Sequence, residues 1–140
     1  MSADVLPFNL YNTRDRVRVL KVLRIIRQHL GRENAISPRV VAIETEIDYR
    51  DVQAIVKYLV EYCSKPIGST SGQPPGYYMI RNEDELAANY RHFLRRGISC
   101  LRHARAFNKA SIVGPIVGQL ELELNEDDDE VTRNRVTKEA

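Results

Sequence analysis

The sequence predicts a mostly helical α+β chain, in which three helices, a small β-hairpin and a further long helix follow one another. Three observations predict this class. Apolar residues recur at helical spacing in several segments, each preceded by a residue type that caps helices. A loop rich in proline and glycine at 70–76 separates two short β-prone segments. Leu, Ile, Val and Phe make up 39 of the 140 residues, enough to build a packed core.

The first predicted elements are an arm and a helix. Residues 1–12 form an N-terminal arm with Leu6, Phe8 and Leu10 as its apolar anchors. A helix is expected over 14–30, with Thr13 as its N-cap and Gly31 as its C-cap. Its apolar residues fall on one face at helical spacing and are expected to be buried: Val19, Val22, Leu23, Ile26 and Leu30.

Two helix starts follow in close succession. Ser37-Pro38 reads as an N-cap followed by a proline in the first turn, so a short helix begins there and stops near 44–47. Asp48 is a second N-cap, opening a helix over 49–62. The buried stripe predicted for that helix contains Val52, Ile55, Val56, Leu59 and Val60.

A hairpin and a long helix complete the regular part of the chain. Residues 65–80 read as two strands with a flexible tip, and Asn82 caps a helix that reaches about Asn108. This helix is expected to pack on the helix at 14–30. Its apolar residues form a heptad-like seam: Leu86, Tyr90, Phe93, Gly97, Cys100, Ala104 and Phe107. We expect a homodimer to form through Leu86, Tyr90, Phe93, Leu94, Leu101 and Phe107.

Residues 111–140 read as a tail. Gly114-Pro115 is expected to break the helical pattern, and the alternation Leu120-Glu-Leu-Glu-Leu124 permits a short strand. The acidic run at 125–130 is expected to be solvated, and residues 131–140 to be disordered.

The charge is divided between these parts. Residues 1–110 hold 18 of the 21 basic and 11 of the 19 acidic residues, a net charge of +7, whereas residues 111–140 carry a net charge of −5. Sixteen of the basic residues are Arg, whose planar guanidinium binds phosphates and bases bidentately. The basic body therefore favours nucleic acid as a partner. The acidic run is expected to compete with that partner for the basic face.

Several protein classes are not indicated. No apolar run is long enough to span a membrane, and Met1–Asp4 lacks the features of a secretory signal. The two cysteines suit core thiols in a reducing cytoplasm. The histidines share no ligand spacing, and no catalytic or phosphate-binding motif occurs. We therefore expect no enzyme activity, cofactor, metal or small-molecule substrate.

The order of helices and hairpin resembles the winged helix-turn-helix family over about 13–81. The resemblance rests on Ser37-Pro38, on Asp48 and on the wing at 65–80. The stretch Gly76–Ile80 and the helix start at 82–86 are similar to small winged-helix proteins of phages and mobile elements, which also carry a long helix after the wing. The resemblance implies that the third helix enters the major groove of DNA while the wing contacts phosphate or the minor groove.

The residues support the same interpretation. Arg50, Gln53 and Lys57 lie opposite the apolar stripe, and Arg and Gln are common readers of guanine and adenine. The full predicted DNA-binding set is Ser37, Arg39, Tyr49, Arg50, Gln53, Lys57, Lys65, Ser69, Thr70, Ser71 and Gln73.

Two alternatives stay open. The polar face of the third helix could be merely solvated, and Glu44, Glu46, Asp48 and Asp51 count against DNA contact there. The chain could also be a winged-helix module for protein–protein interaction, rather than a transcriptional regulator or replication accessory protein that binds double-stranded DNA. Salt-dependent binding to arbitrary duplex separates the two classes.

Overall fold

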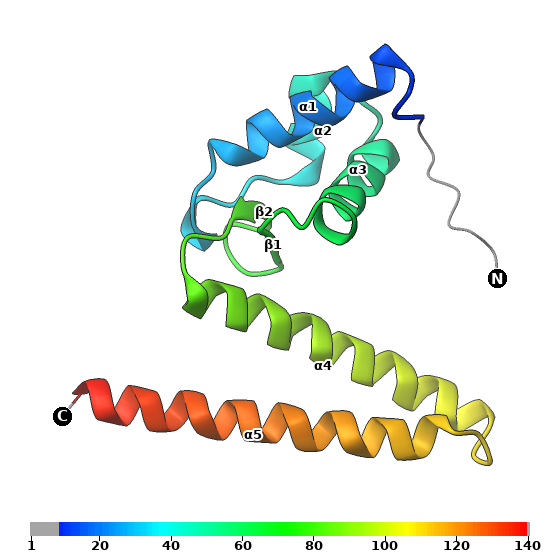
Figure 1. The fold of residues 1–140 in the computed structure, drawn as a ribbon, viewed down its shortest axis with the longest axis vertical. Coiled ribbons are helices and arrows are strands. Elements are labelled where there is room, and N and C mark those ends of the chain that lie inside the picture. The colour runs from blue at the N-terminus through cyan, green and yellow to red at the C-terminus, as the bar shows by residue number, and fades with distance from the viewer. Residues whose placement is uncertain (1–8, 140) are drawn as a thin grey trace. The chain divides into compact units, whose positions relative to one another are not determined.

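A computed structural model describes residues 9–139 of the chain, which are mostly helical and contain a two-stranded antiparallel sheet (Figure 1). This confirms the predicted α+β class. The chain divides into two compact units, with the boundary between Asn89 and Tyr90. The long helix α4 (Glu83–Phe107) begins in the first unit and continues in the second, close to the predicted limits.

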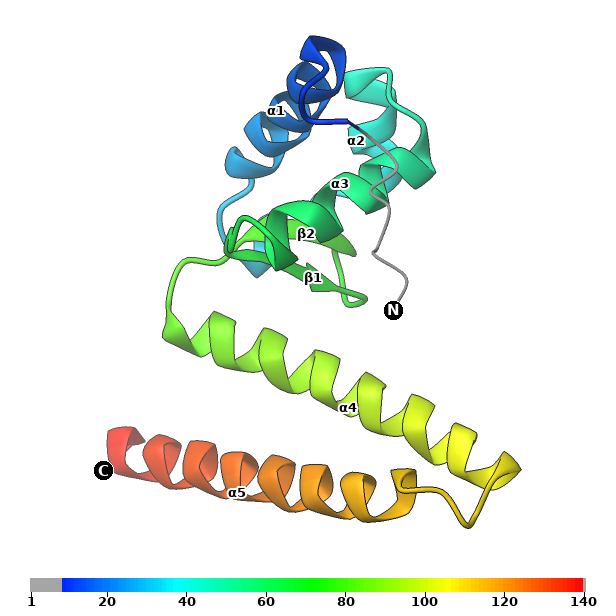
Figure 2. The ribbon, with the colours of Figure 1, turned by 45° about the vertical axis from the view of Figure 1, so that its right-hand side comes forward.

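The first unit holds three α-helices, a short 3-10 helix and a hairpin, arranged as Figure 2 shows. Most of the predicted arm lies outside the described residues. The elements are α1 (Thr13–Arg27), η1 (Arg32–Asn34), α2 (Pro38–Thr45), α3 (Tyr49–Glu61), β1 (Ile67–Thr70) and β2 (Gly76–Met79).

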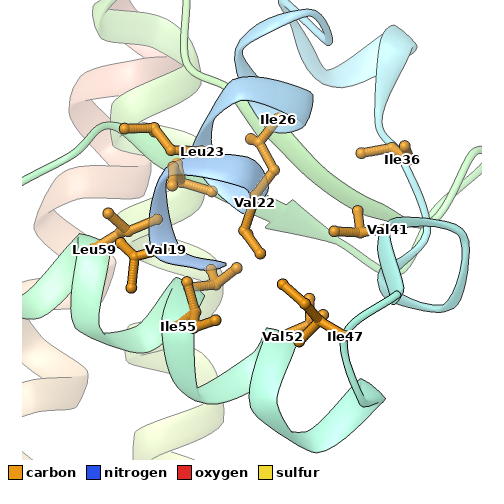
Figure 3. Close-up of a cluster of buried hydrophobic side chains, with 12 residues drawn as sticks. Val19, Val22, Leu23, Ile26, Ile36, Val41, Ile47, Val52, Ile55 and Leu59 are labelled. Atoms are coloured by element: carbon orange, nitrogen blue, oxygen red, sulfur yellow. The ribbon is translucent and has the colours of Figure 1, made fainter. Parts of the chain in front are cut away.

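The core of this unit forms where α1, α2 and α3 meet (Figure 3). The predicted stripes of α1 and α3 supply most of it, and Leu10 packs against its edge. Leu30 and Val60, which were expected to be buried, are exposed. The apolar core residues from the three helices are Val19, Val22, Leu23, Ile26, Val41, Val52, Ile55, Val56 and Leu59, joined by Ile36, Ile47 and Ile67.

The helix starts follow the predicted capping residues with one exception. Ser37 and Asp48 each accept a hydrogen bond from a backbone N–H in the first turn of α2 and α3. Helix α1 is capped by Asn12 instead of Thr13, and it ends at Arg27 rather than at Leu30. Gly31 therefore does not cap α1. It has a positive φ of 87° and opens η1.

The early end of α1 is explained by the hairpin. The segment that joins α1 to α2 runs along the free edge of β2, so β2 has hydrogen-bonded neighbours on both sides. The N–H of Met79 donates to the carbonyl of His29 at 2.8 Å, and the N–H of Gly31 donates to Met79 at 2.9 Å. Further along, Ile36 and Tyr77 each donate a backbone N–H to the carbonyl of the other, and both hydrogen bonds are 2.8 Å long. The His29 carbonyl and the Gly31 N–H thus find their partners on β2 instead of in a longer helix.

Polar contacts hold the start of α4 to η1 and the hairpin. The Glu85 carboxylate accepts the N–H of Arg32 at 2.9 Å and the N–H of Arg81 at 2.8 Å. The Arg81 guanidinium pairs with both Glu85 and Glu33. Asn89 accepts the N–H of Ser69 in β1 at 3.2 Å. These bonds join α4 to η1 and the hairpin, whereas the sequence predicted packing on α1.

The second unit consists of the rest of α4 and a second long helix, α5 (Val113–Glu139), which run antiparallel and side by side (Figures 1 and 2). Ile98 of α4 and Val117 of α5 are buried. Arg102 donates to Glu121 at 2.6 Å, and the Tyr90 hydroxyl donates to Glu123 at 2.7 Å. Apolar burial and these polar contacts together hold the pair.

The strand and the disordered end predicted for residues 111–140 were wrong, because α5 continues to Glu139. The alternation at 120–124 fits a helix as well. Leu120 and Leu124 are four residues apart and half-buried on one face with Val117, while Leu122 is 65% exposed. Pro115 lies in the first turn, where a missing N–H costs no helical hydrogen bond.

Gly76 should tolerate no side chain. Its φ is 132°, and a Cβ there would collide with the backbone carbonyl of Ile36. We expect Gly76→Ala to lower the free energy of unfolding by roughly 1–3 kcal/mol, measured by urea denaturation. Gly72→Ala is the matched control, because its Cβ would meet side-chain atoms and no backbone, the movable guanidinium of Arg32 at 3.2 Å and the Thr70 hydroxyl at 3.4 Å. Equal stability of the two variants would contradict the close approach of Gly76 to the backbone of Ile36.

Glu85 should make the stability depend on acidic pH. Burial raises its pKa, but the hydrogen bonds from Arg32 and Arg81 outweigh burial and hold the pKa below its ordinary value of 4.5. Because the pKa of Glu85 is lower in the folded protein than in the unfolded chain, the ionised carboxylate stabilises the fold above pH 4.5. This stabilisation is lost as the pH falls through the pKa of the folded protein.

The Glu85→Gln variant tests this dependence. At neutral pH it should be less stable than the parent by roughly 1–3 kcal/mol, because it loses hydrogen bonds to a charged acceptor. The difference should shrink when denaturation is repeated below pH 4.5. Glu83→Gln, an exposed position in the same first turn, is the control. A difference that stays constant with pH would contradict the assignment.

Candidate nucleic-acid interface

The exposed face of α3 carries the polar residues that the sequence singled out. Asp48 caps the helix by accepting the N–H of Arg50 at 2.9 Å. The apolar stripe of α3 faces the core, and this leaves Arg50, Gln53 and Lys57 exposed. Their spacing of three and four residues keeps Arg50, Gln53 and Lys57 on one side of the helix. The side chains present a guanidinium, an amide and an ammonium group to solvent.

Contacts join this face to the start of α2. Ser37 accepts the N–H of Arg39 at 3.2 Å, which fixes the first turn of α2. The Arg39 guanidinium lies over the ring of Tyr49, 5.2 Å from its centroid, in a cation–π arrangement. The Tyr49 hydroxyl accepts a hydrogen bond of 3.1 Å from the amide of Gln53. Arg39, Tyr49 and Gln53 therefore form one contact chain across two helices.

The acidic residues near α3 have other contacts. Asp51 pairs with Arg18 of α1, with 2.5 Å between Oδ2 and Nη2, and this hydrogen bond raises the pKa of the Arg18 guanidinium. Asp48 serves as the cap of α3. Glu44 and Glu46 line a hollow together with Lys21 and Arg24 of α1. Asp48 and Asp51 are thus engaged within the protein, which weakens the part of the objection to anion binding that rests on these two carboxylates.

The hairpin residues divide into two groups. Ser69 and Thr70 are half-buried, and the Thr70 hydroxyl accepts the N–H of Gly72 at 3.1 Å. Lys65 is also half-buried. Ser71 and Gln73 are exposed in the connection between the strands. Ser71 and Gln73 are therefore the better placed of the five predicted hairpin residues for contact with a ligand.

Sequence reasoning missed Arg32. This exposed residue of η1 donates from Nε to the Thr70 hydroxyl at 3.3 Å, so its guanidinium lies beside the hairpin connection. Arg32 and Thr70 are 38 positions apart, and no local signal places them together. Only the pairing of the α1–α2 connection with β2 brings this cation to the hairpin.

The other predicted residues have these positions. Leu86, Tyr90, Phe93 and Phe107 of α4 are exposed, whereas Leu94 and Leu101 are half-buried. Both cysteines are exposed, so the prediction that Cys63 and Cys100 are core thiols was wrong. Aromatic rings of Phe93 and Phe107 lie edge-on to those of His92 and His103, and the remaining histidine, His29, contacts the carbonyl of Asn34 at 2.8 Å.

No cluster of three or more potential metal-ligating side chains occurs among the described residues. None of the helices described within 9–139 is both long and apolar enough to cross a bilayer. Comparisons with protein-family models, curated proteins and solved structures find no match to this chain.

Proposed function

We propose that the first unit is a winged helix-turn-helix that binds double-stranded DNA, as a transcriptional regulator or a replication accessory protein. In this proposal α3 enters the major groove and the β1–β2 hairpin is the wing. The order of helices followed by a hairpin supports it, as does the net charge of +7 on residues 1–110. A major groove admits one α-helix, and α3 has a continuous polar side available for it.

The contact chain of Arg39, Tyr49 and Gln53 carries the proposal. These contacts already order the three side chains, so less rotamer freedom is lost when DNA binds. The contact chain lies beside Arg50, which is in the first turn of α3. Residues near the N-terminus of a recognition helix are the ones that reach base edges. Arg50 and Gln53 then read bases, while Lys57 contacts phosphate. Gln73 in the wing and Arg32 of η1 beside it contact the DNA backbone or the minor groove.

The roles of Arg50 and Lys57 can be separated by substitution. A preferred duplex is first selected from a random library. Arg50→Ala should weaken binding to that duplex by roughly 1–3 kcal/mol and relax the preference at one base pair. Arg50→Lys should also lose specificity, because an ammonium group cannot bind guanine bidentately. Lys57→Ala should weaken all sequences alike and lower the salt slope by about one.

The control for this series is Arg27→Ala, which removes an exposed cation in the last turn of α1. Fluorescence anisotropy across a salt series measures each variant, and circular dichroism shows that it is folded. If a folded triple variant at Arg50, Gln53 and Lys57 binds DNA as well as the parent, α3 is not the reader. A protein-interaction module then becomes the better proposal.

The acidic part of α5 should weaken non-specific binding. Glu126, Asp129 and Glu130 are exposed, and fixed anions compete with DNA for the cations of the first unit. Replacing all three by Gln or Asn should tighten binding to random duplex at low salt, and the effect should fade as salt screens it. The same change at Glu61, Glu83 and Asp84 controls for total charge. Unchanged affinity for random duplex would indicate that the acidic residues of α5 only keep the protein soluble.

A further inference from the structure

Helix α4 has two apolar faces in the second unit, and α5 covers one of them. The covered face contains Ile98, which is buried, with Leu94 and Leu101 half-buried beside it. The second face is the heptad-like seam, which is displaced by one residue, or about 100°, around the helix. Its large members remain open, with Phe93 48% and Phe107 81% exposed. Gly97, Cys100 and Ala104 of the same face are exposed too.

The open face divides by side-chain size along the helix. Tyr90 and Phe93 are large, and Tyr90 stays 47% exposed although its hydroxyl donates to Glu123 of α5. The next three members, Gly97, Cys100 and Ala104, are small. Two copies aligned in parallel would place large residues against large ones and leave gaps beside the small ones. Two antiparallel copies can instead place Phe93 against Gly97 and Tyr90 against Cys100 of the other copy. Close packing favours the arrangement in which large side chains fill the space left by small ones.

We propose that this open face binds a second copy of the chain, with the two α4 helices antiparallel. When a second copy runs in the opposite direction, the large residues of each seam face the small residues of the other. A two-fold symmetric interface requires such self-complementarity. The two-fold axis passes between residues 93 and 97. Cys100, exposed in a single chain, then lies under Tyr90 of the other copy.

The seam itself contains no charged residue, but cations lie beside it. Arg102 is paired with Glu121 of α5 at 2.6 Å. The Arg96 guanidinium lies 5.8 Å from the centroid of the Phe93 ring, at the border of the seam. The two Arg96 side chains flank the axis and repel each other, so the dimer should tighten as salt rises. DNA binding has the opposite salt dependence.

Gly97 provides the main test, by sedimentation equilibrium without DNA. A Cβ at this position meets nothing within 4 Å in the chain itself, so Gly97→Leu should fold normally. In the antiparallel dimer the new side chain would collide with Phe93 of the other copy. We expect the dimer dissociation constant to rise at least about tenfold. Gly118→Leu, equally open and on α5, is the matched control and should leave the constant unchanged.

Disulfide crosslinking tests the direction of the helices. In a Cys63→Ser background, Tyr90→Cys should crosslink to Cys100 of the other copy on oxidation. The two positions are about 15 Å apart along one helix, too far for a bridge within a chain. Without Tyr90→Cys, Cys100 should not crosslink. A monomeric parent, an unchanged or tighter Gly97→Leu dimer, or crosslinking through Cys100 alone would overturn the proposal.

Discussion

Backbone pairing between β2 and the α1–α2 connection is the constraint on which the first unit depends. It ends α1 at Arg27, because His29 and Gly31 bond to Met79 instead of continuing the helix. The exchange between Ile36 and Tyr77 then sets the position of Ser37, where α2 begins. Gly76 permits this approach because a side chain there would occupy the space of the Ile36 carbonyl.

Two parts of the candidate interface follow from that pairing. Because α2 begins at Ser37, Arg39 lies in its first turn and reaches the ring of Tyr49 at the start of α3. Because the α1–α2 connection follows β2, Arg32 lies beside Thr70. Arg32 of η1 and Arg39 of α2 thus lie beside the hairpin and α3, which come later in the chain. The pairing of Asp51 with Arg18 leaves the polar side of α3 richer in cations than its sequence suggests.

Helix α4 belongs to both units and uses different residues in each. In the first unit Glu85 and Asn89 make polar contacts with η1, Arg81 and β1. In the second unit the face around Ile98 meets α5, and the seam with Phe93 and Gly97 stays open. The proposed DNA contacts and the proposed contact between copies therefore use separate residues, so substitutions can address them one at a time.

Local signals in the sequence were enough to predict several of the elements. Capping side chains marked the starts of α2, α3 and α4, because an N-cap bonds to the turn that follows it. Apolar spacing identified the buried sides of α1 and α3, and with them the exposed residues Arg50, Gln53 and Lys57. The loop rich in proline and glycine located the hairpin.

Features that depend on distant neighbours could not be predicted in this way and are set by packing between segments. The end of α1 and the place of Arg32 follow from β2, which lies more than forty residues further along the chain. The pattern at 120–124 satisfies both a strand and a helix, and α5 is helical because Val117, Leu120 and Leu124 then share one inward face. That contact also decided which face of α4 is covered. Local spacing identifies an apolar face, but the element that covers the face is set by packing between segments.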